Sequence, residues 1–201
     1  MTTKERILDL TIKLFLDKGC KSLTMDQIAS ENGISKRTLY ELFTDKSTLL
    51  EECIIRFHNK KNEAVSVLRK DSKNVLELLL KIAQNYNQNL ISLPYDFYVE
   101  VRRYYPQTFE NVVTKMSAAQ YAIVQDMMAK GQEEGVFLKR LSTKSMAIAL
   151  MQMSNSNSEY GIYDFFNIHY DQYVRDIMLH VLRGFSTEKG IKIIDDYYNK
   201  N

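Results

Sequence analysis

The sequence predicts an all-α protein, and two observations carry this prediction. The 201 residues include only 7 glycines and 2 prolines, whereas β-rich and loop-rich folds need more of both. Apolar residues recur at helical spacing along most of the chain, and no stretch alternates as a strand would. We expect two domains, a small N-terminal domain over residues 1–48 and a larger helical domain over residues 49–201.

Three helices are expected before residue 44. Thr2 and Glu5 fit a capping box that opens the first helix, and Gly19 suits its C-terminal end. Thr24 begins a second capping box, and the helix it opens ends at Asn32-Gly33. Ser35 is a good N-cap for a third helix. That helix is too short to be stable alone, so it must pack against its two predecessors.

The remaining chain is also expected to be helical. Pro106 is expected to close one helix, and Gly135 to end another. The expected helices run from Thr44-Asp45 to about residue 70, from 75 to before Pro94, and over 95–105, 109–134, 143–155 and 173–185, with a short one after Thr187.

Several classes of protein are not favoured by the sequence. No apolar run approaches the roughly 18 residues that span a membrane, and the N-terminus lacks an apolar signal region, so we expect a cytoplasmic protein with no membrane partner. Cys20 and Cys53 are expected to be free thiols. The 3 histidines match no metal-binding spacing. Since no catalytic motif is found, we expect no enzyme activity and no cofactor; the alternative is a catalytic pair hidden among the middle helices.

The second and third helices have the pattern of a helix-turn-helix, because a tight glycine turn joins them and the second exposes polar side chains. In that motif the second helix enters the DNA major groove. Residues 1–57 carry nine basic and nine acidic side chains, so bulk charge does not predict nucleic-acid binding, and the basic residues must gather on one face. The alternative is a small helical subdomain whose charges are only solvated.

The side chains of this region have the chemistry of DNA contacts. Lys36 and Arg37 can donate to guanine O6 and N7 or to phosphate, and Thr38 can meet a base edge or a thymine methyl. The Tyr40 phenol can reach a phosphate oxygen. The candidate DNA-binding residues are Thr24, Ser35, Lys36, Arg37, Thr38, Tyr40 and Lys46.

Two stretches carry a resemblance to a known family: "RILDLTIKLFLDKG" and "LTMDQIASENGISKRTLYELFTDKSTLL". They resemble the DNA-binding domain of the tetracycline-repressor (TetR) family of bacterial transcriptional regulators. The resemblance implies a homodimer with about nine or ten helices per subunit. It places Thr24, Tyr40 and Lys46 at positions that usually hold phosphate, and Lys36, Arg37 and Thr38 at positions that usually face bases. Many members have a small residue where Arg37 stands, so the operator sequence is not predictable.

The resemblance also implies that the C-terminal part forms the dimer and, in many members, binds a small molecule. The two strongly apolar helices expected over 143–155 and 173–185 would form a four-helix bundle with their copies in a second chain. They would suit an internal core equally well. The candidate interface residues are Met146, Leu150, Val174, Ile177, Met178, Val181 and Phe185.

Aromatic and methionine side chains of the middle helices suit a pocket for a small hydrophobic or aromatic effector. Plain core packing is the alternative. The candidate lining residues are Tyr86, Tyr98, Tyr105, Tyr121, Met128 and Met151. The leading hypothesis is therefore a ligand-responsive repressor that binds double-stranded operator DNA as a homodimer. A corepressor would fit equally well, and a helical adaptor that has lost DNA binding is the alternative class.

Overall fold

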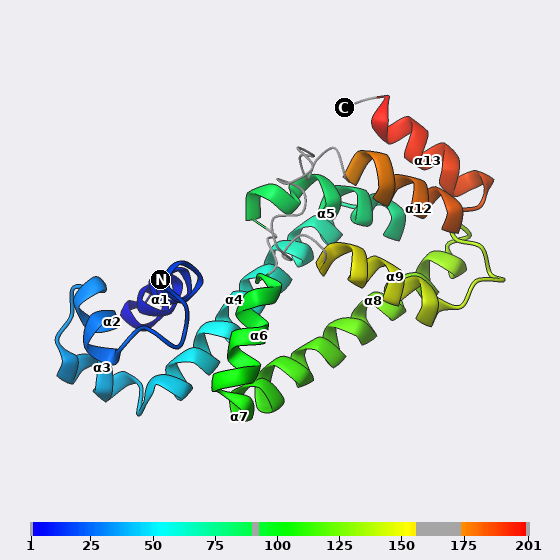
Figure 1. Cartoon of the computed structure of the whole chain (residues 1–201). Helices are drawn as coiled ribbons and strands as arrows, with labels where there is room; N and C mark the ends of the chain where they lie inside the picture. The colour runs from blue at the N-terminus through cyan, green and yellow to red at the C-terminus, as the bar shows by residue number, and fades with distance from the viewer. Residues whose placement is uncertain (1, 90–92, 156–173, 200–201) are drawn as a thin grey trace. The chain divides into compact units, whose positions relative to one another are not determined.

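The computed structural model describes residues 2–89, 93–155 and 174–199. In these ranges the regular structure is helical, apart from one isolated antiparallel bridge between Phe137 and Ser186 (Figure 1). The predicted all-α fold is confirmed. No helix within the described ranges is long and apolar enough to span a bilayer.

The helices follow the chain in a simple order. The N-terminal helices are α1 (Thr3–Lys18), α2 (Met25–Glu31) and α3 (Lys36–Leu42), followed by the long α4 (Lys46–Lys70). The next are α5 (Val75–Asn89), α6 (Tyr95–Tyr104), α7 (Pro106–Thr108), the π-helical turn η1 (Phe109–Thr114) and α8 (Lys115–Glu133). The last are α9 (Thr143–Asn155), η3 (Val174–Met178), α12 (Leu179–Phe185) and α13 (Glu188–Tyr198).

The expected helix ends agree closely with the structure at the N-terminus. The Thr2 and Thr24 hydroxyls each accept a hydrogen bond from the amide three residues on, and Glu5 and Gln27 complete the two capping boxes. Gly19 has φ +79°, a conformation that glycine adopts without strain. These local signals are sufficient because each satisfies backbone groups that a helix end leaves open.

The prediction that Pro106 closes a helix is confirmed, because α6 ends at Tyr104. The next helical segment begins earlier than the expected residue 109, since Pro106 itself opens α7 and a π-helical turn then leads into α8. A proline at the first helical position loses no hydrogen bond and has a suitable φ. Tyr105, between the two helices, has φ −134° and ψ 57°, which breaks the helical path without ending the helical region.

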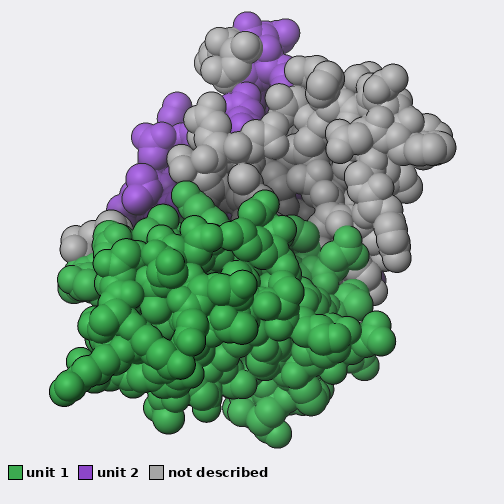
Figure 2. Space-filling model, turned by 60° about the vertical axis from the view of Figure 1, so that its left-hand side comes forward, with its two compact units in different colours: residues 1–62, 93–117 green, residues 63–92, 118–201 purple. Residues whose placement is uncertain are grey.

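The chain forms two compact units, which Figure 2 colours separately. Unit 1 takes residues 1–62 and 93–117, and unit 2 takes residues 63–92 and 118–201. The helix α4 therefore begins in unit 1 and ends in unit 2. This division into compact bodies differs from the predicted functional boundary after residue 48, which stays a prediction.

Unit 1 has one hydrophobic core that joins the N-terminal helices to α6 and η1. Phe15 and Leu50 are almost fully buried in it, and Phe97, Val101 and Val112 belong to the same cluster. The three N-terminal helices are thus packed on α4 and on a segment from much later in the chain.

Unit 2 has its own core, built mainly from α5, α8, α9 and the C-terminal helices. Phe137 is fully buried in it, and its ring occupies the space over Gly131 in α8. The Thr187 hydroxyl donates to Gly135 O at 2.7 Å and caps α13 by accepting from Gly190 N–H, so one side chain ties α13 to the end of α8.

Candidate nucleic-acid interface

The turn between α2 and α3 is fixed by Asn32 and Gly33. Asn32 is buried, and its Nδ2 donates to Ile28 O at 2.8 Å and to the Thr11 hydroxyl at 3.2 Å. Gly33 has φ +65°, which side chains rarely tolerate. The turn is therefore anchored from inside by an amide, and it sets the direction in which α3 leaves α2.

Helix α3 is anchored on one face and open on the other. The Ser35 hydroxyl caps it by accepting from Thr38 N–H at 3.0 Å, and Leu39 is fully buried against the core of unit 1. Lys36, Arg37 and Tyr40 are exposed. The structure thus brings these three predicted side chains onto one free helix face, whereas Thr38 is half-buried and its hydroxyl lies 2.8 Å from that of Ser35.

The two basic residues of this face already have counter-ions. Lys36 Nζ lies 2.8 Å and 3.0 Å from the two carboxylate oxygens of Asp26, which raises the pKa of the Lys36 ammonium. Arg37 Nε donates to Glu41 Oε1 at 2.8 Å, one turn further along α3. These ion pairs keep the face close to neutral although its cations are accessible.

Other predicted contacts lie at the rim of this face. Tyr40 is 44% exposed, with Lys36 Nζ 5.9 Å from its ring centroid. Thr24 caps α2 at an exposed position, where its hydroxyl is engaged with Gln27 N–H. A phosphate close to Thr24 would face the positive end of α2.

The Lys46 ammonium contacts other residues of unit 1, which the sequence did not predict. Its Nζ donates to the Lys21 carbonyl at 3.1 Å and lies 5.7 Å from the centroid of the Tyr105 ring, and burial lowers the pKa of this ammonium. The residue joins the start of α4 to the loop between α1 and α2. Its predicted phosphate contact stays a prediction, and in the structure Lys46 serves the internal packing of unit 1.

A single carboxylate holds the same loop from the other side. Glu100 in α6 accepts from Cys20 N–H at 2.9 Å and from Lys21 N–H at 2.8 Å, one bond to each oxygen. Tyr105 O–H donates to Cys20 O at 3.3 Å. We call Glu100, Tyr105, Lys46 and the loop residues Cys20 and Lys21 the α6 joint. No sequence signal predicted it, because Glu100 has no motif around it.

The cysteines have no exposed thiol. Cys20 and Cys53 are both buried and free, as expected. Burial and the neighbouring Glu100 carboxylate raise the pKa of the Cys20 thiol to about 12. A thiol with so high a pKa is almost wholly protonated at neutral pH and reacts slowly.

The predicted effector residues are distributed over both units. Tyr98 and Tyr105 belong to unit 1, where the Tyr98 hydroxyl lies 3.3 Å from His58 Nε2. Tyr121, Met128 and Met151 belong to unit 2, and Met128 is fully buried in its core. The side chain of Tyr86 lies outside the described residues. The role of these residues in a ligand pocket stays a prediction.

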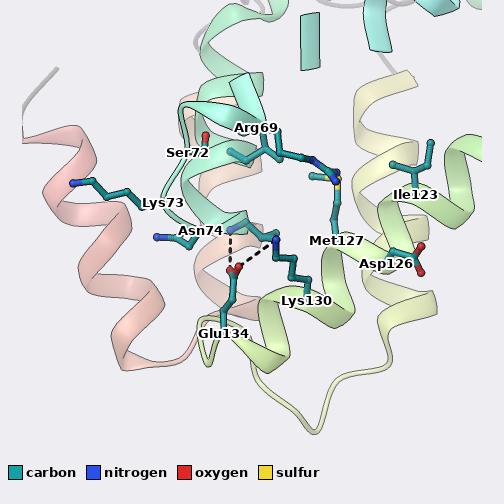
Figure 3. Close-up of a pocket in the computed structure, with 11 residues that line it drawn as sticks. Arg69, Ser72, Lys73, Asn74, Ile123, Asp126, Met127, Lys130 and Glu134 are labelled. Carbon is teal, nitrogen blue, oxygen red and sulfur yellow. Dashed lines mark hydrogen bonds and ion pairs between the residues drawn. The ribbon is translucent and has the colours of Figure 1, made fainter. Parts of the chain in front are cut away.

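A cavity of about 210 Å³ opens in unit 2, between the end of α4, the start of α5 and one side of α8 (Figure 3). Met127 and Ile123 supply apolar surface, Arg69 and Asp126 are among the charged lining residues, and the Arg69 side chain extends toward Met127. Glu134 is engaged already, since its Oε2 accepts from Val75 N–H at 2.8 Å and Lys130 Nζ is 3.9 Å from Oε1. Of the predicted effector residues whose side chains the structure describes, none lines this cavity.

The predicted dimer residues have different environments within one chain. Met146, Leu150 and Met178 are buried in the core of unit 2, and Val181 and Phe185 are partly buried. Ile177 is 47% exposed, and Ile148, on α9, is 50% exposed. The side chain of Val174 lies outside the described residues. Their role at a dimer interface stays a prediction.

The residues that the structure describes contain no group of three or more His, Cys, Asp or Glu side chains that could hold a metal ion.

Helices α2 and α3 form a helix-turn-helix that packs with α1, and α3 presents basic and hydroxyl side chains. This arrangement defines the class of the chain: a helix-turn-helix DNA-binding domain attached to a helical body.

Comparison with known proteins shows which family the N-terminal domain is similar to. Residues 7–53 match the model of the bacterial regulatory proteins of the tetR family. An uncharacterized HTH-type transcriptional regulator, YvaF of Bacillus subtilis (strain 168), is 37% identical over 91 residues. That match covers 45% of this chain and 44% of the relative, so it spans less than half of either protein.

Solved structures share the fold over most of the chain. A TetR-family transcriptional regulator from Marinobacter aquaeolei VT8 has a TM-score of 0.73 at 18% identity, covering 100% of this chain and 98% of that one. AibR, solved with isovaleryl coenzyme A and operator DNA, has a TM-score of 0.64 at 17% identity, covering 88% and 96%. Residues 7–53 are therefore similar to the DNA-binding domain of the tetR family of bacterial regulatory proteins, and the whole chain shares the fold of solved TetR-family regulators.

Proposed function

We propose that this chain is a ligand-responsive transcriptional repressor that binds a near-palindromic operator as a homodimer. The observation that carries the proposal is the free face of α3, where Lys36, Arg37 and Tyr40 are exposed while Leu39 anchors the helix from behind. A short helix held in this way can enter a major groove with its N-terminal side chains toward the base edges.

A homodimer follows from the need for two such helices. One recognition helix reads only a few base pairs, and two copies related by a twofold axis read the two halves of a palindrome. The exposed Ile148 and Ile177 support a contact between copies, because large aliphatic side chains half open to water are stabilised when a partner covers them. The partner in this proposal is a second copy of the chain.

An effector would act by preferring one arrangement of the dimer over another. The α6 joint supports such coupling, since Glu100, Tyr105 and Lys46 together occupy the N–H and C=O groups of the loop that precedes α2. A movement of α6 would therefore move the helix-turn-helix with it. The neighbour AibR has an acyl-CoA and operator DNA in one complex, which supports a small organic effector here.

Selection of the full chain against random duplex DNA tests the proposal. We expect a recovered sequence with two inverted half-sites about one helical turn apart. Tyr40→Ala under the same conditions provides a control with the fold retained and one proposed phosphate contact removed. A recovered pool without any common sequence would contradict the proposed function.

A further inference from the structure

The charge arrangement on α3 needs an explanation, because an acidic residue on a DNA-reading face opposes binding. Glu41 is 60% exposed and lies one turn from Arg37, whose side chain is 89% exposed. A carboxylate at this position repels every phosphate nearby. Its presence therefore lowers affinity for all DNA, unless it has a compensating role.

The geometry of the pair points to that role. Glu41 Oε1 accepts from Arg37 Nε, at 2.8 Å. Within the described residues the two terminal nitrogens of the Arg37 guanidinium make no other hydrogen bond or ion pair. Those two nitrogens form an edge that matches guanine O6 and N7. A carboxylate on Nε thus leaves the guanine-reading edge open and restricts its direction.

We infer that Glu41 is a specificity-determining positioning residue: it holds the Arg37 guanidinium end-on toward a guanine and opposes its use as a general phosphate contact. This inference rests on the proposed function. Phosphate contacts carry no sequence information, whereas base contacts do. Glu41 therefore lowers the affinity for all DNA and raises discrimination at one base pair of each half-site.

The neighbouring pair provides an internal comparison. Asp26 binds the Lys36 ammonium through both carboxylate oxygens, at 2.8 Å and 3.0 Å. An ammonium has no planar fork to orient, so Asp26 can lower affinity but cannot position a reading edge. Asp26→Asn is therefore a charge-matched control on the same face. Glu31→Gln, which removes the partner of Lys18 elsewhere in unit 1, is a second control with the same charge change.

The test measures two affinities for each full-length variant: one for the selected operator and its single-base variants, the other for random duplex DNA. We expect Arg37→Ala to bind random DNA more weakly and to lose a guanine preference of about tenfold. Glu41→Ala should bind random DNA about two- to fivefold more tightly, yet lose about two- to fivefold of the same preference, since an exposed ion pair contributes modestly. In the double variant the preference should equal that of Arg37→Ala.

The controls make the result specific. Asp26→Asn should bind random DNA more tightly with an unchanged preference at the base pair that Arg37 reads, and Glu31→Gln should change neither quantity. Alanine favours helix, so α3 should persist in both single variants, which circular dichroism verifies. Loss of the preference together with gain in non-specific affinity supports the inference, because loss of structure would lower both.

Either of two results overturns the inference. One is an unchanged guanine preference in Glu41→Ala, and the other is an unchanged preference in Arg37→Ala. A failure of the proposed function is recognised separately and earlier, since the unaltered chain would then bind the selected and random duplexes equally.

Discussion

At the scale of single residues, the sequence predicts which side chains are exposed on α3 better than it predicts their partners. Exposure follows from helical spacing around the buried Leu39. Partners depend on side chains from other segments. Lys46 illustrates this: its sequence position suggested a phosphate contact, and its ammonium bonds the Lys21 carbonyl.

Tyr40 is expected to bind a phosphate through its hydroxyl. Tyr40→Phe should therefore weaken binding to all duplexes alike. Because the phenol is uncharged and neutralises no phosphate, the slope of log K against log salt should stay unchanged. Fluorescence anisotropy over a salt series measures both quantities. Equal affinities of Tyr40→Phe and the unaltered chain would remove Tyr40 from the phosphate contacts.

Gly131 is expected to be required for packing in unit 2. A Cβ at this position would lie 2.2 Å from the buried Phe137 ring, and a ring in a full core has no room to retreat. Gly131→Ala should lower the free energy of unfolding by about 1–3 kcal/mol, measured by urea denaturation. Gly184→Ala, with nothing within 4 Å of the added carbon, is the matched control. Equal stability of the two variants would contradict this account.

His58 should make stability fall in mild acid. Burial and the nearby Lys61 lower the pKa of His58 to about 4, from a usual value of 6.5. Between pH 6.5 and 4 the unfolded chain therefore binds a proton at His58 that the folded chain does not bind. The stability that neutral His58 contributes is present above pH 6.5 and is lost as pH falls toward 4. His58→Gln should have a flatter stability profile than the unaltered chain across that window. Parallel urea-denaturation profiles would show that His58 titrates normally.

At the scale of elements, local signals predicted the first three helices and missed the α6 joint. Capping boxes and a glycine turn act within a few residues, so they can be read from the sequence. Glu100 acts on residues 80 and 79 positions earlier in the chain, and no local pattern encodes that distance. Pro106 closes one helix as predicted, but the start of the next helix at the same residue was missed, since proline suits both the residue after one helix and the first residue of the next.

The α6 joint gives a prediction about local order. Glu100→Gln retains one acceptor oxygen but loses the charge and the second acceptor, so it should destabilise the protein by about 1–3 kcal/mol. Hydrogen exchange should accelerate at the Cys20 and Lys21 amides more than in the middle of α1. Asp96→Asn, an exposed change on the same helix, is the control. Unaltered protection at both amides would show that the carboxylate does not hold the loop.

At the scale of the whole molecule, the fold is shared with solved TetR-family regulators, while the proposed dimer and effector depend on surfaces that a second copy or a ligand would cover. Apolarity alone could not separate interface from core: the predicted dimer residue Met146 is buried within unit 2, whereas Ile148 on the same helix is half exposed. A stripe of apolar residues does not indicate whether its own chain or a second copy will cover it.

The proposed dimer should depend on these exposed isoleucines. We expect the unaltered chain to sediment as a dimer at micromolar concentration without DNA, and Ile148→Glu with Ile177→Glu to shift it toward monomer, because charges would be buried at the contact. Ile55→Glu, at an exposed isoleucine of α4, is the control. A monomeric unaltered chain would contradict the assignment.

The measurement that tests the central claim most directly is fluorescence anisotropy of the purified chain with DNA from upstream of its own gene, compared with a scrambled duplex over a range of salt. The account predicts tighter binding to the upstream duplex at every salt concentration, with affinity that falls steeply as salt rises. Absence of binding to either duplex at low salt would contradict it, because the exposed face of α3 would then have no nucleic-acid partner.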